Sequence, residues 1–113
     1  MNPGYKSIKK NEDYRAVYKS GIIKNSPYFT LTYLDNNKDE TRIGIAVSKK
    51  TGNSVKRNRI KRRMREIIRK NYSKIKKGFD LVIVMRDKSE SLSFSELEGI
   101  FIDIIKDIGL WQE

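Results

Sequence analysis

The residues of this chain best suited to chemistry are lysine and arginine side chains gathered in one segment, Ser48 to Lys77. This segment holds 14 Lys or Arg residues and a single acid, Glu66, so its local charge is +13. The whole chain carries +11, which leaves the rest of the sequence slightly acidic. Cations confined to one segment are typical of a site that binds a polyanion through its phosphates.

Groups that could catalyse a reaction are scarce. The 113 residues include no histidine and no cysteine, which excludes imidazole acid–base catalysis, thiol nucleophiles and disulfides. Asp80 and Asp87 could in principle hold a metal ion. They stand at opposite ends of one predicted strand, so surface solubility is the better interpretation of both. The sequence therefore indicates binding chemistry without a credible set of catalytic groups, and it does not indicate whether the protein itself binds a metal ion.

The basic segment also has the apolar pattern of a folded helix. Four apolar residues recur at helical spacing and share one stripe that must face a core: Ile60, Met64, Ile67 and Ile68. Val55 and Tyr72 extend this stripe, so we predict a helix from about Ser54 to Tyr72. Gly78 is its predicted end, and turn residues and N-cap candidates precede it: Thr51, Gly52, Asn53 and Ser54.

The cations of this helix fall on several of its sides. Arg57, Lys61 and Arg65, each four residues apart, line one flank. The others are covered by Arg59, Arg62, Arg63 and Arg69. Like charges repel across a helical turn, so this arrangement costs stability unless an anion neutralises it. A merely solvated helix face would normally mix both signs, which this segment does not.

Two predicted elements precede the strands. Residues 1–10 are short, basic and turn-prone, and we predict a loosely held arm there. A helix follows, with Asn11 as its N-cap and Gly21 as its stop. Tyr14, Val17 and Tyr18 share one side of this helix. From periodicity alone, both tyrosine rings are more typical of a core than of a binding site.

The strand signals predict one small sheet. Ile22 and Ile23 open a strand that resumes, after a turn, from Tyr28 to Leu34. Its apolar face carries Phe29, Leu31 and Tyr33, and its mixed face carries Tyr28, Thr30 and Thr32. A return strand, Arg42 to Ser48, follows the hairpin loop 35–40 and places small residues on one face. The apolar run from Phe79 to Arg86 predicts a buried central strand.

The last predicted helix begins at a capping box of Ser93 and Glu96 and ends at Gly109. Trp111 follows it and is expected to anchor the terminus. Together these elements predict a single α+β domain over residues 1–113, with helices packed on one sheet. No apolar run is long enough to span a membrane and the N-terminus has no signal-peptide core, so we expect a cytoplasmic protein.

The chemistry of the basic helix favours RNA over DNA as its partner. Arginine makes bidentate contacts with phosphate and stacks on bases. Aromatic rings elsewhere in the chain could stack on unpaired bases, which suits single-stranded or structured RNA better than the major groove of DNA.

The stretch Val47 to Ile67, VSKKTGNSVKRNRIKRRMREI, resembles the signature of the protein subunit of bacterial ribonuclease P. The centre of that signature is the triplet Arg57-Asn58-Arg59, with Lys49-Lys50 and Gly52-Asn53 before it and Lys61-Arg62 and Arg65 after it. Residues Lys10 to Gly21 are similar to the family's first helix, so the resemblance covers nearly the whole chain. Two departures are mild: Tyr14 and Tyr18 stand where phenylalanine is frequent, and Ser54 where alanine is.

The resemblance implies a fold and a function. The fold is a four-stranded sheet with three helices and a left-handed βαβ crossover, like the second domain of a small-subunit ribosomal protein. The function is that of a small cofactor to a catalytic RNA, one protein for each RNA. This RNA uses bound Mg²⁺ to hydrolyse the phosphodiester at the 5′ end of mature tRNA in its precursor. The isolated protein is then expected to be inactive.

The resemblance also assigns residues to two RNA partners. Contacts with the catalytic RNA are implied for Lys49, Lys50, Asn53, Lys56, Asn58, Arg59 and Arg62. Contacts with the single-stranded 5′ leader of precursor tRNA are implied for Tyr14, Tyr18, Thr30, Thr32, Arg57, Lys61 and Arg65. This second assignment reverses the interpretation of the two tyrosines as core residues.

Two other classes of protein stay open. A structural RNA-binding protein of ribosomal type would share the charge and the fold, but it would not prefer tRNA precursors over their products. A protein-only nuclease would cut RNA unaided. The sequence does not indicate the oligomeric state.

Overall fold

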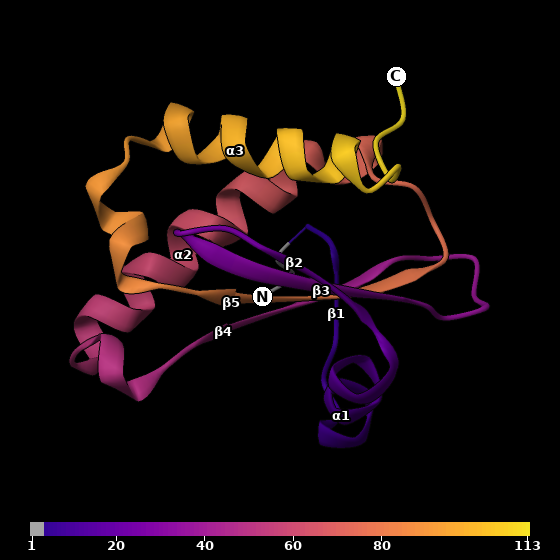
Figure 1. Ribbon diagram of the computed structural model, residues 1–113, viewed down its shortest axis with the longest axis horizontal. Coiled ribbons are helices and arrows are strands. Elements are labelled where there is room, and N and C mark those ends of the chain that lie inside the picture. Colours follow the sequence, from indigo (N-terminus) through magenta and orange to yellow (C-terminus); the bar gives the residue numbers. More distant parts are fainter. Residues whose placement is uncertain (1–3) are drawn as a thin grey trace.

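One mixed sheet carries the three α-helices of this protein, whose computed structural model describes residues 4–113 (Figure 1). The helices are α1 (Asn11–Ser20), α2 (Ser54–Asn71) and α3 (Phe94–Asp107). The strands are β1 (Lys6–Ser7), β2 (Ile22–Asn25), β3 (Phe29–Asp35), β4 (Arg42–Val47) and β5 (Phe79–Met85). Three short 3-10 helices are η1 (Lys49–Thr51), η2 (Tyr72–Lys74) and η3 (Asp87–Ser91).

The sheet has five strands in the order β1-β4-β5-β3-β2, not the four that the resemblance implies. The added strand, β1, pairs in parallel with β4 through Lys6–Arg42 and Ser7–Ile43. Tyr5 and Ile8, which flank it, are buried. The predicted loose arm is therefore wrong for residues 4–10, because these two apolar side chains pack into the domain. Residues 1–3, the rest of that arm, lie outside the described residues.

The crossover that the resemblance implies is present in the described fold. β4 and β5 are parallel neighbours, and the chain between them passes through α2. The remaining pairs, β3–β5 and β2–β3, are antiparallel. The left hand of the crossover stays a prediction. Because β4 and β5 run in parallel, their carboxyl ends lie side by side. The segments that follow them, η1 and η3, therefore begin at the same end of the sheet.

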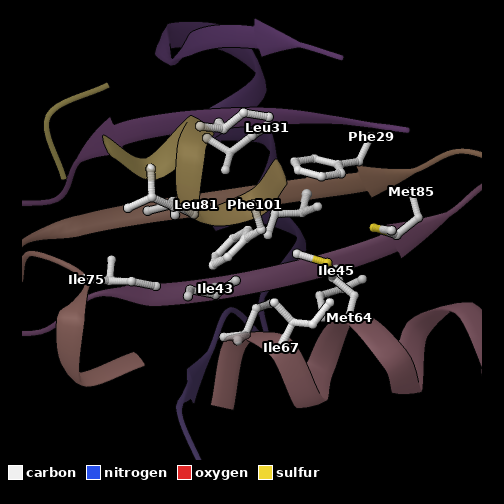
Figure 2. Close-up of a cluster of buried hydrophobic side chains, with 14 of the residues drawn as sticks. Phe29, Leu31, Ile43, Ile45, Met64, Ile67, Ile75, Leu81, Met85 and Phe101 are labelled. Carbon is white, nitrogen blue, oxygen red and sulfur yellow. The ribbon is translucent and has the colours of Figure 1, made fainter. Parts of the chain in front are cut away.

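α2 and α3 cover one face of the sheet, and α1 lies against the other (Figure 1). Figure 2 shows the core under α2 and α3, where Phe29 and Leu31 of β3 lie near Phe101 of α3. The predicted stripe of α2 is confirmed, since its four apolar residues are buried. Val55 is not part of it, because its side chain is 69% exposed. Burying each large apolar side chain stabilises the fold by about 1.5–3 kcal/mol, which fixes α2 on the sheet.

The face under α1 is only partly covered. Its buried hydrophobic residues are Ile8, Val17 of α1 and Val82 of β5. Toward the carboxyl ends of β4 and β5, the strands place Ala46, Val84 and Thr30 in one register row, and all three stay partly exposed. The face therefore has one end covered by α1 and one end accessible to a ligand.

The helix boundaries follow the predictions closely, with two corrections. Asn53 caps α2, and its side chain accepts a hydrogen bond from the Lys56 amide at 2.9 Å. The predicted capping box of α3 is confirmed. Asn11, however, is the first residue of α1 and not its cap. Gly78 does not end α2, which passes into η2 after Asn71.

Asp80 is a buried structural residue and not a surface acid, which corrects the interpretation from the sequence. Its carboxylate accepts hydrogen bonds from Arg42 Nε at 2.9 Å and Asn36 Nδ2 at 2.8 Å. Arg42 also reaches Asp13 at 3.2 Å, so this cluster ties β4 and β5 to α1. The hydrogen bond to Asp80 raises the pKa of Arg42. Asp87 is exposed, as predicted for a surface acid.

The terminus after α3 is anchored as predicted. Trp111 forms an isolated antiparallel bridge with Ile75, and Lys106 Nζ lies 5.7 Å from the centre of its ring. This contact holds the end of the chain against the segment that follows α2.

Candidate nucleic-acid interface

The loop between β4 and α2 presents two cations on a short, well-anchored turn. The Ser48 hydroxyl accepts a hydrogen bond from the Lys50 amide at 3.2 Å and starts η1. Thr51 is buried and holds the turn down, while Lys49 and Lys50 are exposed. Gly52 has φ of 148°, a conformation that residues with a side chain rarely adopt. The loop therefore delivers both lysines beside the first turn of α2.

One flank of α2 is neutralised by groups from η3 and α3. Lys56 Nζ lies 2.5 Å from the Asp87 carboxylate and 3.5 Å from that of Glu90. Arg59 donates to Glu90 Oε2 from Nε at 3.0 Å and from Nη2 at 2.8 Å. We call this the paired flank, and its cations are Lys56, Arg59, Arg63 and Lys70.

The remaining contacts of the paired flank extend along the helix. Arg63 donates to the main-chain oxygens of Ser89 and Leu92. Lys70 Nζ lies 3.2 Å from the Glu98 carboxylate. The hydrogen bond from Arg59 lowers the pKa of Glu90, and the bond to Asp87 raises the pKa of Lys56, so these ion pairs persist at neutral pH.

The opposite flank, which we call the open flank, consists of Arg57, Lys61 and Arg65. None of the three has a carboxylate partner among residues 4–113. Arg57 Nη1 donates to the Gly52 oxygen at 3.0 Å. Burial raises the pKa of the Tyr5 hydroxyl, and the adjacent Arg65 guanidinium partly offsets that shift. The cations of the open flank therefore remain available to phosphates.

The structure divides the residues that the resemblance assigned to the catalytic RNA. Five of them lie exposed at the amino-terminal end of α2 or just before it: Lys49, Lys50, Asn53, Asn58 and Arg62. Lys56 and Arg59 are already paired with Asp87 and Glu90. These pairs were not predicted from the sequence. The signal that could have predicted these pairs is the parallel pairing of β4 and β5, because parallel neighbouring strands bring the segments that follow them to one end of a sheet.

The leader residues on α1 differ in their exposure. The Tyr14 ring lies directly on Gly44 of β4, where an added Cβ would stand 2.4 Å from the Tyr14 hydroxyl oxygen. Tyr14 also packs on the cluster of Ile8, Val17 and Val82, so it is partly a core residue. Tyr18 is 50% exposed and can stack on a ligand. Burial raises the pKa of both hydroxyls, and Tyr18 and Tyr5 raise that of Tyr14 further.

The two threonines also differ. Thr32 is 4% exposed and lies beneath Gly21, so its side chain is not accessible to RNA. Thr30 is partly exposed; its hydroxyl donates to Asn25 Oδ1 at 3.1 Å and accepts from Arg86 Nη2 at 2.9 Å. Arg86 was not singled out in the sequence, although it follows β5 directly at the accessible end of the sheet.

A shallow pocket of about 330 Å³ connects this end of the sheet to the loop before α2. Its lining comes from both places: Thr30, Ser48, Lys50, Thr51, Val84, Met85, Arg86 and Asp87. The accessible sheet end and the loop before α2 thus line one pocket.

Residues 4–113 contain neither a cluster of metal ligands nor a membrane-spanning helix. No group of three or more Asp, Glu, His or Cys side chains converges there in a way that could hold a metal ion. No helix in the described part of the chain is long and apolar enough to cross a membrane.

Comparisons with known proteins identify one family. A family model described as "Ribonuclease P" matches residues 3–109. The chain is 41% identical over 99 residues to the "Ribonuclease P protein component" of Finegoldia magna, covering 88% of this chain and 87% of that protein. It is 42% identical over 106 residues to that of Clostridium novyi, covering 92% and 94% of the two chains.

Solved structures give the same result. The RNase P protein of Staphylococcus aureus superposes with a TM-score of 0.83 at 31% identity, covering 94% of this chain and 97% of that one. The RNase P protein from Thermotoga maritima gives a TM-score of 0.82 at 30% identity, covering 90% and 96%. A matched fold and a match over nearly the whole sequence lead to one conclusion: the chain belongs to the ribonuclease P protein family.

Proposed function

We propose that this protein binds two RNAs at once within a ribonuclease P ribonucleoprotein, the endoribonuclease that matures tRNA 5′ ends. One surface holds the catalytic RNA, and the other holds the 5′ leader of precursor tRNA while the leader is removed. The observation that supports this best is that one pocket joins the loop before α2, which carries Lys50, to the partly exposed sheet end at Thr30 and Val84.

The catalytic RNA is assigned to the amino-terminal end of α2. Lys49, Lys50 and Arg62 have no carboxylate partner in the described chain and can each contact a phosphate. Asn53 and Asn58 are exposed beside them and can add hydrogen bonds to the RNA backbone. Lys56 and Arg59 join this surface once RNA phosphates replace their carboxylate partners. Such contacts fix the position of the RNA without reading its sequence.

The leader is assigned to the region between α1 and the open flank of α2. An extended single strand can lie along the row of small side chains formed by Ala46, Val84 and Thr30. The exposed face of Tyr18 offers a base-stacking surface worth about 1–3 kcal/mol for each stacked base. Arg57, Lys61 and Arg65 would neutralise the leader phosphates. Tyr14 supports this surface from below, and Thr32 does so without touching the RNA.

The protein itself has no described site suited to magnesium. Its acids are dispersed or engaged in ion pairs with lysine and arginine, and no three of them converge among residues 4–113. We therefore assign no step of the reaction to a metal on this chain and propose that Mg²⁺ is held mainly by the RNA. We further propose one protein subunit for each RNA, acting in the cytoplasm.

Reconstitution tests this proposal. The protein is combined with a bacterial ribonuclease P RNA, and cleavage of a tRNA precursor is measured at low Mg²⁺ with and without the protein. We expect the protein to raise the rate of 5′ leader removal under these conditions. A protein that binds the RNA equally well but leaves the rate unchanged would instead be a structural RNA-binding protein of ribosomal type.

The isolated protein is the second arm of this test. We expect no cleavage of precursor tRNA by RNA-free protein, because the chain lacks histidine, cysteine and a convergent set of carboxylates. An mRNA substrate is included, since one solved relative is described as an RNase P protein mutant of Staphylococcus aureus "with defective mRNA degradation activity". Cleavage of the precursor that is lost in Asp87→Ala would favour a protein-only nuclease.

A further inference from the structure

We propose that Asp87 and Glu90 act as an internal substitute for RNA phosphates. They cover Lys56 and Arg59 in the free protein and so reduce the binding of RNAs that cannot displace them. In this view the two carboxylates are selectivity determinants for the RNA partner. The inference deepens the proposed function and rests on it.

The first support is the geometry of the contact. Arg59 places two donors on one oxygen of Glu90, and Lys56 Nζ lies between Asp87 and Glu90. A carboxylate that accepts from Nε and Nη2 of arginine occupies the part of the guanidinium that a phosphate oxygen would also use. RNA can therefore engage these cations fully only by replacing the carboxylates.

The second support is that η3 is held in place independently of its acids. Arg63 donates to the main-chain oxygens of Ser89 and Leu92, and the Ser89 side chain is buried. Leu92 packs against the main core. These contacts do not depend on the charge of Asp87 or Glu90. The two carboxylates are thus presented to α2 by a fixed backbone.

The third support is that the cover can be exchanged. Each ion pair has one well-exposed partner, which water reaches: Arg59 is 62% exposed and Glu90 27%, while Asp87 is 65% exposed and Lys56 31%. Exposed ion pairs contribute little free energy, so an incoming phosphate can displace one at small cost. An RNA that makes few contacts gains little from this exchange, whereas one that places several phosphates in register gains at each of them.

The contrast with the open flank argues for a specific role. Every cation of the paired flank meets a carboxylate or a main-chain oxygen of η3 or α3, while no cation of the open flank meets a carboxylate in residues 4–113. The open flank can attract any RNA strand from a distance. The paired flank binds only an RNA whose phosphates can replace the carboxylates of Asp87 and Glu90.

The test compares Asp87→Asn/Glu90→Gln with a control that has the same net charge, Glu12→Gln/Asp103→Asn. Both control acids are exposed, and no lysine or arginine in the described chain pairs with them. Two probes are titrated over a range of salt: an unstructured oligouridylate and a bacterial ribonuclease P RNA. Circular dichroism and thermal unfolding confirm that each variant is folded.

We expect Asp87→Asn/Glu90→Gln to bind oligouridylate about tenfold more tightly than the control variant. The reason is that Lys56 and Arg59 become free for charge-assisted contacts. The salt slope should steepen by about 0.7 for each added phosphate contact. The gain for ribonuclease P RNA should be smaller, so the preference for it falls. Adding Lys56→Gln should remove much of the oligouridylate gain, because Lys56 is one of the two cations that the neutral variant frees.

Three results would overturn the proposal. The first is a variant that binds oligouridylate no better than the charge-matched control. The second is weaker binding of both RNAs, which would mean that the acids position the cations for RNA. The third is an equal gain for both probes, which would remove the selectivity. Failure of the unaltered protein to prefer ribonuclease P RNA would instead contradict the proposed function. In that case the gain in oligouridylate binding would still test whether Asp87 and Glu90 block Lys56 and Arg59.

Discussion

At the scale of single residues, the contact between Tyr14 and Gly44 sets the height of α1 above the sheet. The absence of a side chain at position 44 lets the Tyr14 ring lie on the backbone of β4. An alanine there would place its Cβ 2.6 Å from two ring carbons. This is closer than real Cβ atoms approach, so the ring or the helix must move.

We therefore predict that Gly44→Ala destabilises the protein by about 1–3 kcal/mol, as overpacking in a tight site usually does. Urea denaturation measures this change. Gly99→Ala is the matched control, because Gly99 lies in α3 with nothing within 4 Å of an added Cβ. That substitution should stabilise the protein by up to about 1 kcal/mol through helix propensity. Equal effects at the two positions would mean that the Tyr14 contact is unimportant.

Residue roles that depend on distant partners could not be predicted from the sequence. Asp80 was interpreted as a surface acid because its partners, Asn36 and Arg42, lie 44 and 38 residues away. Glu90, which accepts hydrogen bonds from Arg59, lies 31 residues away from it in the sequence. Only the fold brings such groups together, whereas spacing along one element was enough to predict the stripe of α2.

At the scale of elements, α3 depends on the capping box at its first turn. The Ser93 hydroxyl accepts from the Glu96 amide at 3.1 Å, and Glu96 Oε1 accepts from the Ser93 amide at 2.8 Å. Hydrogen bonds from Ser93 lower the pKa of Glu96 below its ordinary value of 4.5. The charged form of Glu96 is thus bound more tightly in the folded protein than in the unfolded chain.

This linkage predicts a pH dependence. Because the folded pKa is lowered, the contribution of Glu96 to stability is fully present above about pH 4.5 and is lost as the pH falls through the lowered value. Denaturation at a series of pH values should show a steeper loss below pH 4.5 in the natural protein than in Glu96→Gln. If both lose stability in parallel, the carboxylate has no such role. Ser93→Ala should cost about 1 kcal/mol at neutral pH.

Cations of α2 with and without a carboxylate partner predict different effects on RNA binding. Arg62→Ala should weaken binding to the catalytic RNA by about 1–3 kcal/mol, because Arg62 is exposed and has no carboxylate partner in the described chain. Lys70→Ala should change it much less, because Lys70 is paired with Glu98 at the far end of the helix. Filter binding at several salt concentrations measures both.

Binding of the natural protein should also fall steeply as salt rises. If about five or more phosphates are neutralised, affinity drops by orders of magnitude between low and moderate salt. A flat salt response, or equal losses in the two variants, would place the catalytic-RNA surface elsewhere.

Among the elements, long periodic segments were predictable and short ones were not. α2 and α3 follow from apolar spacing over several turns. β1 is only two residues long and has no period, so nothing local distinguishes it from a loose arm. Val55 fits the helical spacing of the stripe but is exposed, because spacing does not show how far along a helix its partner sheet extends.

At the scale of the whole molecule, the parallel pairing of β4 with β5 brings the loop before α2 and the segment after β5 to the same end of the sheet. The order of elements along the chain could be predicted from periodicity, but the predicted hairpin of β3 and β4 is wrong, because β5 lies between these strands in the sheet. The resemblance supplied the crossover, which periodicity does not reveal. We propose that one RNA binds on α2 while a second strand lies on the accessible end of the sheet.

The most direct test of this account is the affinity of the reconstituted holoenzyme for tRNA precursors whose leaders differ in length. The variants are Tyr18→Leu, which changes an exposed ring, and Lys61→Ala and Arg65→Ala on the open flank. We predict a loss of about 1–3 kcal/mol for each lost base contact in Tyr18→Leu, and only for leaders several nucleotides long. The two cation variants should share this dependence on length, and binding of mature tRNA should not change. Equal losses for every length, mature tRNA included, would contradict the account.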